Sequence, residues 1–153
     1  MARAAYRPSD FALRYALEEG RAPQGQLDAQ LGVRPPKWLC IADTLVLVFD
    51  GLNADLVAFD AYTNRALWRP TRSLGVPEAL GTGSLRLAAP PRDTDRVDLG
   101  VIPQYQYAES EAHLRISLGR PGAQHYRIST CLVVGIDAQG IATLDVSDLR
   151  LQE

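Results

Sequence analysis

Two five-residue segments near the C-terminus carry the same chemical pattern, with histidine, arginine and serine at alternate positions. They are His113-Leu114-Arg115-Ile116-Ser117 and His125-Tyr126-Arg127-Ile128-Ser129. Strict alternation is typical of β-strands, in which successive side chains point to opposite faces. Imidazole, guanidinium and hydroxyl groups all donate hydrogen bonds, and guanidinium suits carboxylates and phosphates in particular. The pattern therefore predicts two strands, each with one polar and one apolar face.

We expect these two strands to pair as a hairpin, because their apolar residues must share the core face and this constrains the register. Such a hairpin would bring six polar residues onto one face: His113, Arg115, Ser117, His125, Arg127 and Ser129. Arginines opposite each other across a sheet repel unless an anion lies between them. Three interpretations follow: a solvated outer face, a site for an anionic ligand or acidic partner, and catalysis by the two histidines.

A second candidate surface is the tyrosine-containing segment 103–107. Tyr105 and Tyr107 fall on one face of a short predicted strand, and Pro103 marks a sheet edge because proline cannot donate to a ladder. Two interpretations are open for these tyrosines. Either they pack in the core with hydroxyls reaching water, or they form an edge that binds a partner, since tyrosine is enriched at interfaces.

Metal, cofactor and nucleophile motifs are absent from the sequence. The two cysteines, Cys40 and Cys131, lie in apolar strand-like runs and are interpreted as buried free thiols. Two cysteines and two histidines scattered along the chain do not match a zinc signature. No phosphate-binding glycine loop, dinucleotide fingerprint or nucleophile elbow occurs. The sequence thus predicts no metal and no cofactor, and it favours a non-enzymatic protein over an enzyme.

Composition excludes further classes of function. The 153 residues include 16 basic and 18 acidic ones, for a net charge of −2, which argues against a nucleic-acid-binding protein. No apolar run is long enough to span a membrane and no signal peptide is recognisable, so a cytoplasmic location is expected. Lys37 is the only lysine among many arginines, which suggests a bacterial or phage source. The oligomeric state is not encoded in any of these patterns.

The length favours a single domain over residues 1–153, in two parts. Residues 1–36 are predicted to be helical, with one helix from the N-cap Ser9 to Gly20 and a second over Gln26–Leu31. Residues 37–153 are predicted to form an antiparallel β core of about nine or ten short strands. The predicted class is therefore α+β: mostly antiparallel β, as a sandwich or as a roll or barrel, with one or two N-terminal helices.

The leading functional hypothesis is a non-enzymatic bacterial or phage accessory protein that binds another protein, as immunity proteins and small inhibitors do. It rests on a compact acidic domain without a catalytic motif. The alternative is a small β-barrel or sandwich that binds a small anionic or phosphorylated ligand. A hydrolase that uses His113 and His125 belongs to this alternative.

Overall fold

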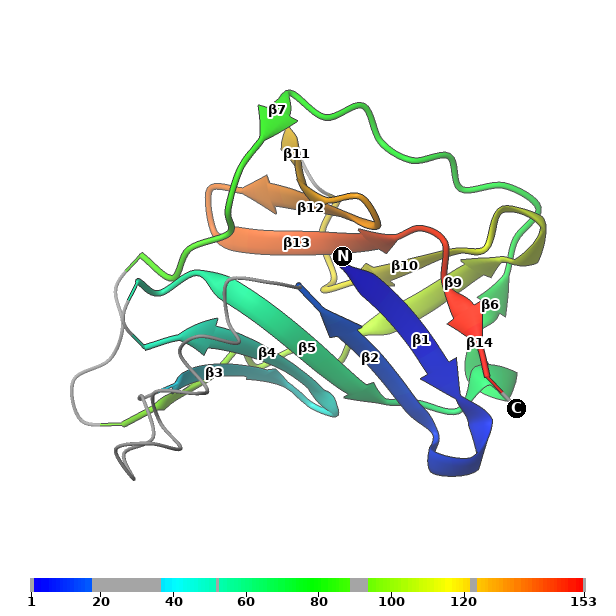
Figure 1. Ribbon diagram of the computed structural model, residues 1–153, viewed down its shortest axis with the longest axis horizontal. Helices are drawn as coiled ribbons and strands as arrows, with labels where there is room; N and C mark the ends of the chain where they lie inside the picture. Colours follow the sequence, from blue (N-terminus) through cyan, green and yellow to red (C-terminus); the bar gives the residue numbers. More distant parts are fainter. Residues whose placement is uncertain (1, 18–36, 52, 89–93, 122–123, 153) are drawn as a thin grey trace.

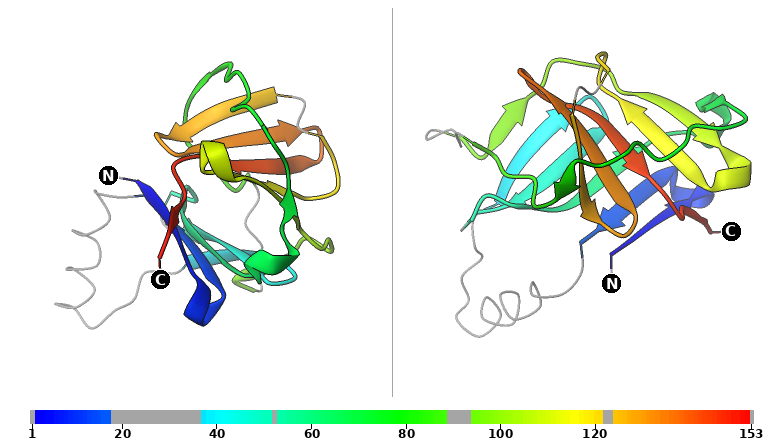
Figure 2. Two further views of the ribbon diagram at one scale, coloured as in Figure 1. Left: turned by 90° about the vertical axis from the view of Figure 1, so that its right-hand side faces the viewer. Right: turned by 90° about the horizontal axis from the view of Figure 1, so that it is seen from above.

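Two seven-stranded β-sheets packed face to face make up the described part of the chain (Figures 1 and 2). The computed structural model describes residues 2–17, 37–51, 53–88, 94–121 and 124–152. Sheet 1 comprises, in spatial order, β14 (Arg150–Leu151), β1 (Arg3–Arg7), β2 (Ala12–Ala16), β5 (Leu56–Tyr62), β4 (Leu45–Asp50), β3 (Lys37–Ala42) and β8 (Arg96–Asp98). Sheet 2 comprises β6 (Arg69–Pro70), β9 (Gln104–Ala108), β10 (His113–Ser117), β13 (Gly140–Val146), β12 (Leu132–Asp137), β11 (Gln124–Ser129) and β7 (Gly81–Thr82).

The N-terminal segment is β-structure, so the predicted helix from Ser9 to Gly20 and the α+β class are wrong. β1 and β2 form an antiparallel hairpin around the short 3-10 turn η1 (Pro8–Asp10). Buried residues lie two positions apart within each strand, Ala4 and Tyr6 in β1 and Leu13 and Tyr15 in β2, which is the spacing of a β-strand. Phe11, which a helix would have buried, is 51% exposed and has a left-handed φ of 51°. Alternation of apolar residues therefore prevails over the capping signals.

The described residues contain no α-helix. Their only helical elements are the 3-10 turns η1, η2 (Arg65–Leu67) and η3 (Glu109–Glu111). The second predicted helix, Gln26–Leu31, lies outside the described residues. No described helix has the length and apolar character needed to cross a membrane.

Both sheets are mixed, so the predicted antiparallel β core describes only their central strands. The five central strands of each sheet pair antiparallel. The outermost strands β14, β8, β6 and β7 instead pair parallel with their neighbours. A parallel neighbour requires a crossover connection instead of a tight turn. These edge strands are short and are reached by irregular segments, which alternation in the sequence does not reveal.

The two sheets share one topology. The order β1-β2-β5-β4-β3 in sheet 1 corresponds to β9-β10-β13-β12-β11 in sheet 2. Sequence similarity accompanies the correspondence, because Tyr6, Leu13 and Arg14 recur 101 positions later as Tyr107, Leu114 and Arg115. Each half also supplies an edge strand to the other: β6 follows β5 but pairs with β9, and β14 follows β13 but pairs with β1. The halves are thereby interlocked.

The core lies between the sheets. Its largest fully buried side chains include Phe49, Phe59, Leu45 and Leu47 from sheet 1 and Leu114, Ile116, Leu132 and Leu144 from sheet 2. The ring of Tyr15 stacks on Phe59 with centroids 5.0 Å apart. The Tyr15 hydroxyl donates a hydrogen bond to Ser129 Oγ at 2.8 Å, which joins the two sheets directly.

Residues 71–80, hereafter the crossing segment, cover part of the outward face of sheet 2. They connect β6 at one edge of that sheet with β7 at the other, and so pass over the strands between them (Figures 1 and 2). Among the described residues, no comparable segment crosses the outward face of sheet 1. The equivalent faces of the two sheets therefore differ in exposure.

Candidate functional site

The two strands that carry the repeated His-x-Arg-x-Ser pattern, β10 and β11, are not neighbours. β10 pairs with β9 and β13, and β11 pairs with β12 and β7. Two strands therefore lie between them, and the predicted hairpin is wrong. Each strand pairs with the partner that a tight local turn supplies, β9 through η3 and β12 through the turn after Ser129. His113 and His125 consequently do not face each other across a hairpin.

Most of the predicted polar residues nevertheless share the outward face of sheet 2. The strand registers produce two rows across β10, β13, β12 and β11: Arg115, Asp145, Val133 and Arg127 in one, and Ser117, Thr143, Gly135 and His125 in the next. The pattern of alternation thus predicted the face correctly, although the strand order was wrong.

His113 forms a buried polar cluster with Asp145 and Arg115 under the crossing segment. Residues His113 and Asp145 are only 1% and 2% exposed. Asp145 Oδ1 lies 2.7 Å from His113 Nε2 and 2.7 Å from Arg115 Nε. The donor and acceptor roles in the contact with His113 depend on its tautomer, whereas the Nε–H group of Arg115 can only donate. The Asp145 carboxylate thus pairs with the Arg115 guanidinium inside the protein.

Glu111 anchors the crossing segment over this cluster. Its carboxylate accepts hydrogen bonds from Ser73 Oγ at 2.6 Å and from the amides of Leu74 at 2.9 Å and Gly75 at 3.2 Å. These bonds, that from Ser73 foremost, lower the pKa of Glu111 to about 2. Arg115 Nη2 adds a bond to the Gly75 carbonyl at 3.2 Å. The anchoring of the crossing segment explains why His113 is buried.

Ser129 leaves the polar face, in contrast to the prediction. The pairing of β11 with β12 shifts register between Arg127 and Ser129. Such a bulge changes which way the following side chain points. Ser129 Oγ therefore meets Tyr15 in the interior. Arg127 Nη1 donates to the carbonyls of Ser129 and Thr130, both at 3.3 Å, so this guanidinium is held against its own bulge.

Tyr105 and Tyr107 pack against Trp68 instead of forming an open edge. The ring centroid of Trp68 lies 6.4 Å from that of Tyr105 and 5.3 Å from that of Tyr107. Burial is the main cause that raises the pKa of Tyr105 to about 12. β9 is itself flanked by β10 and β6. Both tyrosine rings therefore contact Trp68, and β9 has a paired strand on each side.

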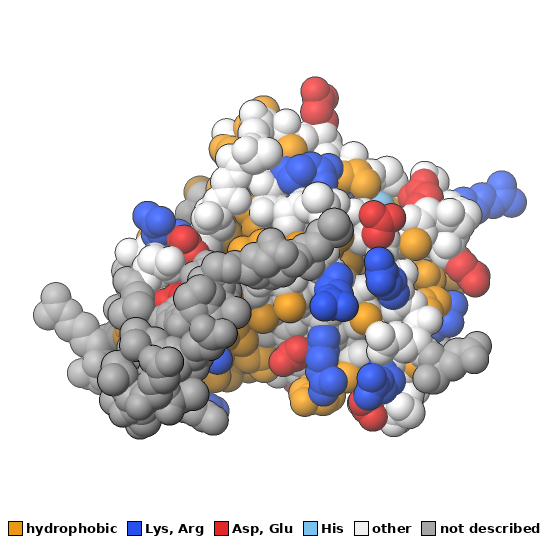
Figure 3. Space-filling view, viewed as in Figure 1, with side chains coloured by type: hydrophobic (Ala, Val, Ile, Leu, Met, Phe, Trp, Pro, Cys, Tyr) orange, Lys and Arg blue, Asp and Glu red, His pale blue; other side chains and the backbone are white. Residues whose placement is uncertain are grey.

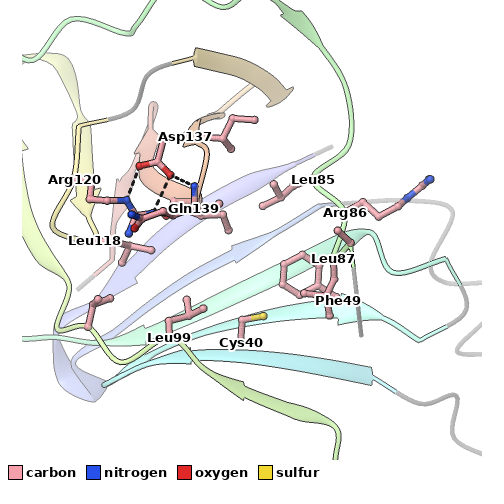
Figure 4. A pocket seen from close by; sticks show the side chains of 15 residues that line it. Cys40, Phe49, Leu85, Arg86, Leu87, Leu99, Leu118, Arg120, Asp137 and Gln139 are labelled. Carbon is pink, nitrogen blue, oxygen red and sulfur yellow. Dashed lines mark hydrogen bonds and ion pairs between the residues drawn. The ribbon is translucent and has the colours of Figure 1, made fainter. Parts of the chain in front are cut away.

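An apolar cleft of about 500 Å³ opens between the two sheets at one end of the sandwich (Figure 4). We call it the inter-sheet cleft. Its apolar lining comes from both sheets and from connecting segments, and includes Cys40, Phe49, Leu85, Leu87, Leu118 and Ile136. Figure 4 shows Cys40 and Phe49 on the side of the cleft opposite to Arg120 and Asp137. The cleft thus combines apolar walls with one ion pair.

The ion pair of the inter-sheet cleft is formed by Arg120 and Asp137. Arg120 Nε donates to Asp137 Oδ2 at 2.5 Å, and Nη2 donates to Oδ1 at 3.2 Å and to the Ile141 carbonyl at 2.8 Å. The hydrogen bond from Arg120 is the largest cause of the lowered pKa of Asp137. Gly119, with φ +90°, turns the chain after β10 and places Arg120 at the cleft.

None of the described residues that line this cleft was predicted from the sequence to be a site residue. Cys40 was recognised only as a buried free thiol, which it is. The lining comes from segments far apart in the chain, so no local motif marks it. An available signal was the repeat that relates the halves, since Asp50 and Asp137 end the equivalent strands β4 and β12. It indicates a shared architecture but not a cleft.

No protein-family model matches the chain, and no curated protein matches it at a significant level. The described part of the chain is a two-sheet β-sandwich with interlocked halves, an inter-sheet cleft, and a polar outward face on sheet 2.

Proposed function

We propose that this protein binds a small molecule that has an apolar body and one acidic group, without transforming it chemically. The observation that supports the proposal is the inter-sheet cleft of about 500 Å³ with apolar walls and an arginine in its lining. Ligand pockets in proteins typically measure roughly 300–1,000 Å³ and combine apolar walls with a few polar groups. This proposal develops the hypothesis of a sandwich that binds an anionic ligand.

An unused donor on Arg120 favours an acidic ligand group. Arg120 lines the cleft together with Asp137, whereas Arg86, also in the lining, donates through Nε to Asp55 Oδ1 at 2.9 Å. Arg120 binds Asp137 and Ile141 through Nε and Nη2, and no hydrogen bond among the described residues uses its Nη1 group. A ligand carboxylate can therefore accept from Nη1 while the ion pair stays intact. Charge-assisted bonds of this kind are stronger than neutral ones.

Labelling of Cys40 tests whether the cleft admits such a ligand. In a Cys131→Ala background, Cys40 is the only thiol, and decanoate should slow its reaction with methyl methanethiosulfonate. In the complementary Cys40→Ala variant, labelling of Cys131 should not respond, because Cys131 does not line the cleft. Equal labelling of Cys40 with and without saturating decanoate would refute the proposal.

The acidic group is tested by comparing decanoate with decanol, which has the same chain length. The double variant Arg120→Gln, Asp137→Asn keeps two hydrogen-bonding side chains but removes the guanidinium. Loss of one charge-assisted bond, about 1.5–3 kcal/mol, should lower the affinity for decanoate roughly tenfold or more and leave decanol unchanged. The matched control is Arg14→Gln, Asp60→Asn, an exposed ion pair of sheet 1. Equal effects of both double variants on decanoate would contradict the role of Arg120.

A protein partner, the leading hypothesis from the sequence, has one supporting observation. Basic side chains gather over the face that β1 and β2 present in Figure 3. The exposed arginines of this face are Arg3, Arg7, Arg14 and Arg150. Only two of them form ion pairs among the described residues, Arg7 with Asp10 and Arg14 with Asp60. We propose an acidic protein surface as the partner of this basic face.

Affinity capture with the wild type and with an Arg3→Glu, Arg150→Glu variant tests this second proposal. A protein bound stoichiometrically by the wild type and lost from the variant supports it. Capture that is equal in both refutes binding through the basic face. The free thiols of Cys40 and Cys131 support a reducing, cytoplasmic location for either function.

A further inference from the structure

A second cleft, of about 540 Å³, lies on the outward face of sheet 2, and most of its described lining residues have polar side chains. We call it the outer cleft. Its polar lining consists of Gln104, Arg115, Ser117, Arg120, His125 and Thr143. No carboxylate occurs among its described lining residues. Two guanidinium groups, an imidazole and two hydroxyls therefore surround one space, and all of them can donate hydrogen bonds.

Gly135 on β12 allows two of these groups to converge. It lies between His125 on β11 and Thr143 on β13. A Cβ atom at this position would collide with Thr143 Oγ1 and would lie 2.9 Å from His125 Nε2. The φ of Gly135 is not in the left-handed region, so the glycine is required for space and not for backbone conformation. The missing side chain leaves room for the hydroxyl and the imidazole side by side.

Thr143 Oγ1 is one of four buried side-chain polar atoms without a hydrogen-bond partner among the described residues, and Thr143 alone of these four residues lines the outer cleft. Thr143 is only 6% exposed. Buried polar groups in proteins nearly always have a partner, and an exception suggests that a ligand or water supplies it. Nothing in the packing of a sheet requires a hydroxyl here, because valine has the same shape. The unpartnered hydroxyl is the second, independent observation that points to a ligand in the outer cleft.

Both arginines of the outer cleft keep donors free. Arg115 uses Nε for Asp145 and Nη2 for Gly75, and Arg120 uses Nε and Nη2 for Asp137 and Ile141. No hydrogen bond among the described residues uses the Nη1 group of either arginine. The carboxylates of Asp145 and Asp137 fix the orientation of the two guanidinium groups and do not belong to the lining of the cleft. Oriented guanidinium groups are well suited to phosphate.

From this arrangement we infer that the outer cleft binds a tetrahedral oxyanion, namely a phosphate group that is either free or part of a phosphomonoester. Thr143, His125 and Ser117 donate to its oxygens from the floor of the cleft, and Arg115 donates from its side. Arg120, whose free Nη1 group serves the inter-sheet cleft, adds positive charge. This site is separate from the inter-sheet cleft in location and in ligand chemistry, although Arg120 lines both. Three of the six residues of the repeated pattern, Arg115, Ser117 and His125, thereby have a common role.

Titration with inorganic phosphate at constant ionic strength, followed by the amide and imidazole NMR signals, tests the inference. The signals of Ser117, His125 and Thr143 should shift together and saturate. Phenyl phosphate in a parallel titration distinguishes the two sources: tighter binding than phosphate indicates a phosphomonoester, and weaker binding indicates free phosphate. Shifts that do not saturate, or that are confined to the arginines of β1 and β2, reduce the outcome to nonspecific ion binding and overturn the inference.

Thr143→Val is the decisive variant, because it keeps the shape of the side chain and removes only the hydroxyl. It should fold as the wild type does and should bind phosphate about fivefold more weakly, the effect of one hydrogen bond. Thr130→Val, in the exposed turn between β11 and β12, is the matched control and should leave the affinity unchanged. Equal affinities of Thr143→Val and wild type would overturn the inference. Decanoate binding in the inter-sheet cleft should not respond to Thr143→Val, so the two proposals can fail independently.

Discussion

Asp60 and Asp145 offer a matched test of how burial changes the value of an ion pair, because they occupy equivalent positions in the two sheets. Arg14 Nε lies 3.9 Å from Asp60 Oδ1, and Arg115 Nε lies 2.7 Å from Asp145 Oδ1. The side chain of Asp60 is 49% exposed and that of Asp145 is 1% exposed. The crossing segment over sheet 2 causes this difference. We therefore compare the substitutions Asp60→Asn and Asp145→Asn.

The expected losses of stability differ severalfold. Removing one partner of a buried ion pair costs about 3–5 kcal/mol. Arg115 keeps 25% of its side chain exposed, so water can solvate part of the guanidinium that remains. We therefore expect Asp145→Asn to lower the free energy of unfolding by about 3 kcal/mol, at the low end of that range. The exposed pair contributes little, so Asp60→Asn should cost less than about 1 kcal/mol.

Urea-induced unfolding, followed by tryptophan fluorescence and circular dichroism, measures both free energies. A double variant, Arg115→Met with Asp145→Asn, should recover part of the loss because no unpaired guanidinium remains. Equal losses for Asp60→Asn and Asp145→Asn would refute the reasoning, since burial would then make no difference. A change in the urea dependence of the free energy would show that the denatured state had been altered as well.

Two further predictions concern the outward face of sheet 2. The bonds from the crossing segment lower the pKa of Glu111 from a usual value of 4.5 to about 2, so their stabilising effect is complete above about pH 4.5 and is lost as the pH falls towards 2. Protection of the Leu74 and Gly75 amides, measured relative to the intrinsic exchange rate at each pH, should fall over that range in the wild type. In Glu111→Gln, which keeps only a neutral acceptor, protection should be weaker and should not depend on pH, and Glu109→Gln, at an 81% exposed side chain, is the control. Wild-type protection free of this pH dependence would contradict the assignment. Gly135→Ala should cost about 1–3 kcal/mol through overpacking, and part of this cost should disappear in a Thr143→Ala background. Gly83→Ala, with no atom within 4 Å of the new Cβ, should be neutral, and an equal cost at both glycines would contradict the close approach at Gly135.

Alternation of apolar residues predicted several strands well, since it depends only on neighbouring residues. The predicted strand Leu45–Phe49 corresponds to β4 (Leu45–Asp50), and Trp38–Ala42 corresponds to β3 (Lys37–Ala42). The prediction of a helix from Ser9 was wrong because it relied on capping residues and not on alternation. The alternation of buried and exposed residues in β1 and β2 was present in the sequence but was outweighed by those signals.

The strand order was not predictable from the two His-x-Arg-x-Ser segments alone. Their similarity suggested that they were partners, whereas each pairs with a strand joined to it by a tight turn. The repeat of Tyr6, Leu13 and Arg14 at Tyr107, Leu114 and Arg115 would have indicated that β2 and β10 are equivalent strands in two halves of one architecture. Its period of 101 residues lies beyond the range in which short repeats are usually sought.

The sequence by itself determined most of the central strands from residue 37 onward, but not the short edge strands. It also determined that Arg115, Ser117 and His125 share one polar face. It did so because strand formation and side-chain alternation are local properties of the chain. The tertiary structure decided everything that depends on which distant segment covers a face. The crossing segment buries His113 and Asp145 on sheet 2, whereas the equivalent face of sheet 1 has Arg14 and Asp60 exposed. Segments from both halves enclose the inter-sheet cleft. Burial, and with it charge pairing and binding capacity, arises only when those segments meet.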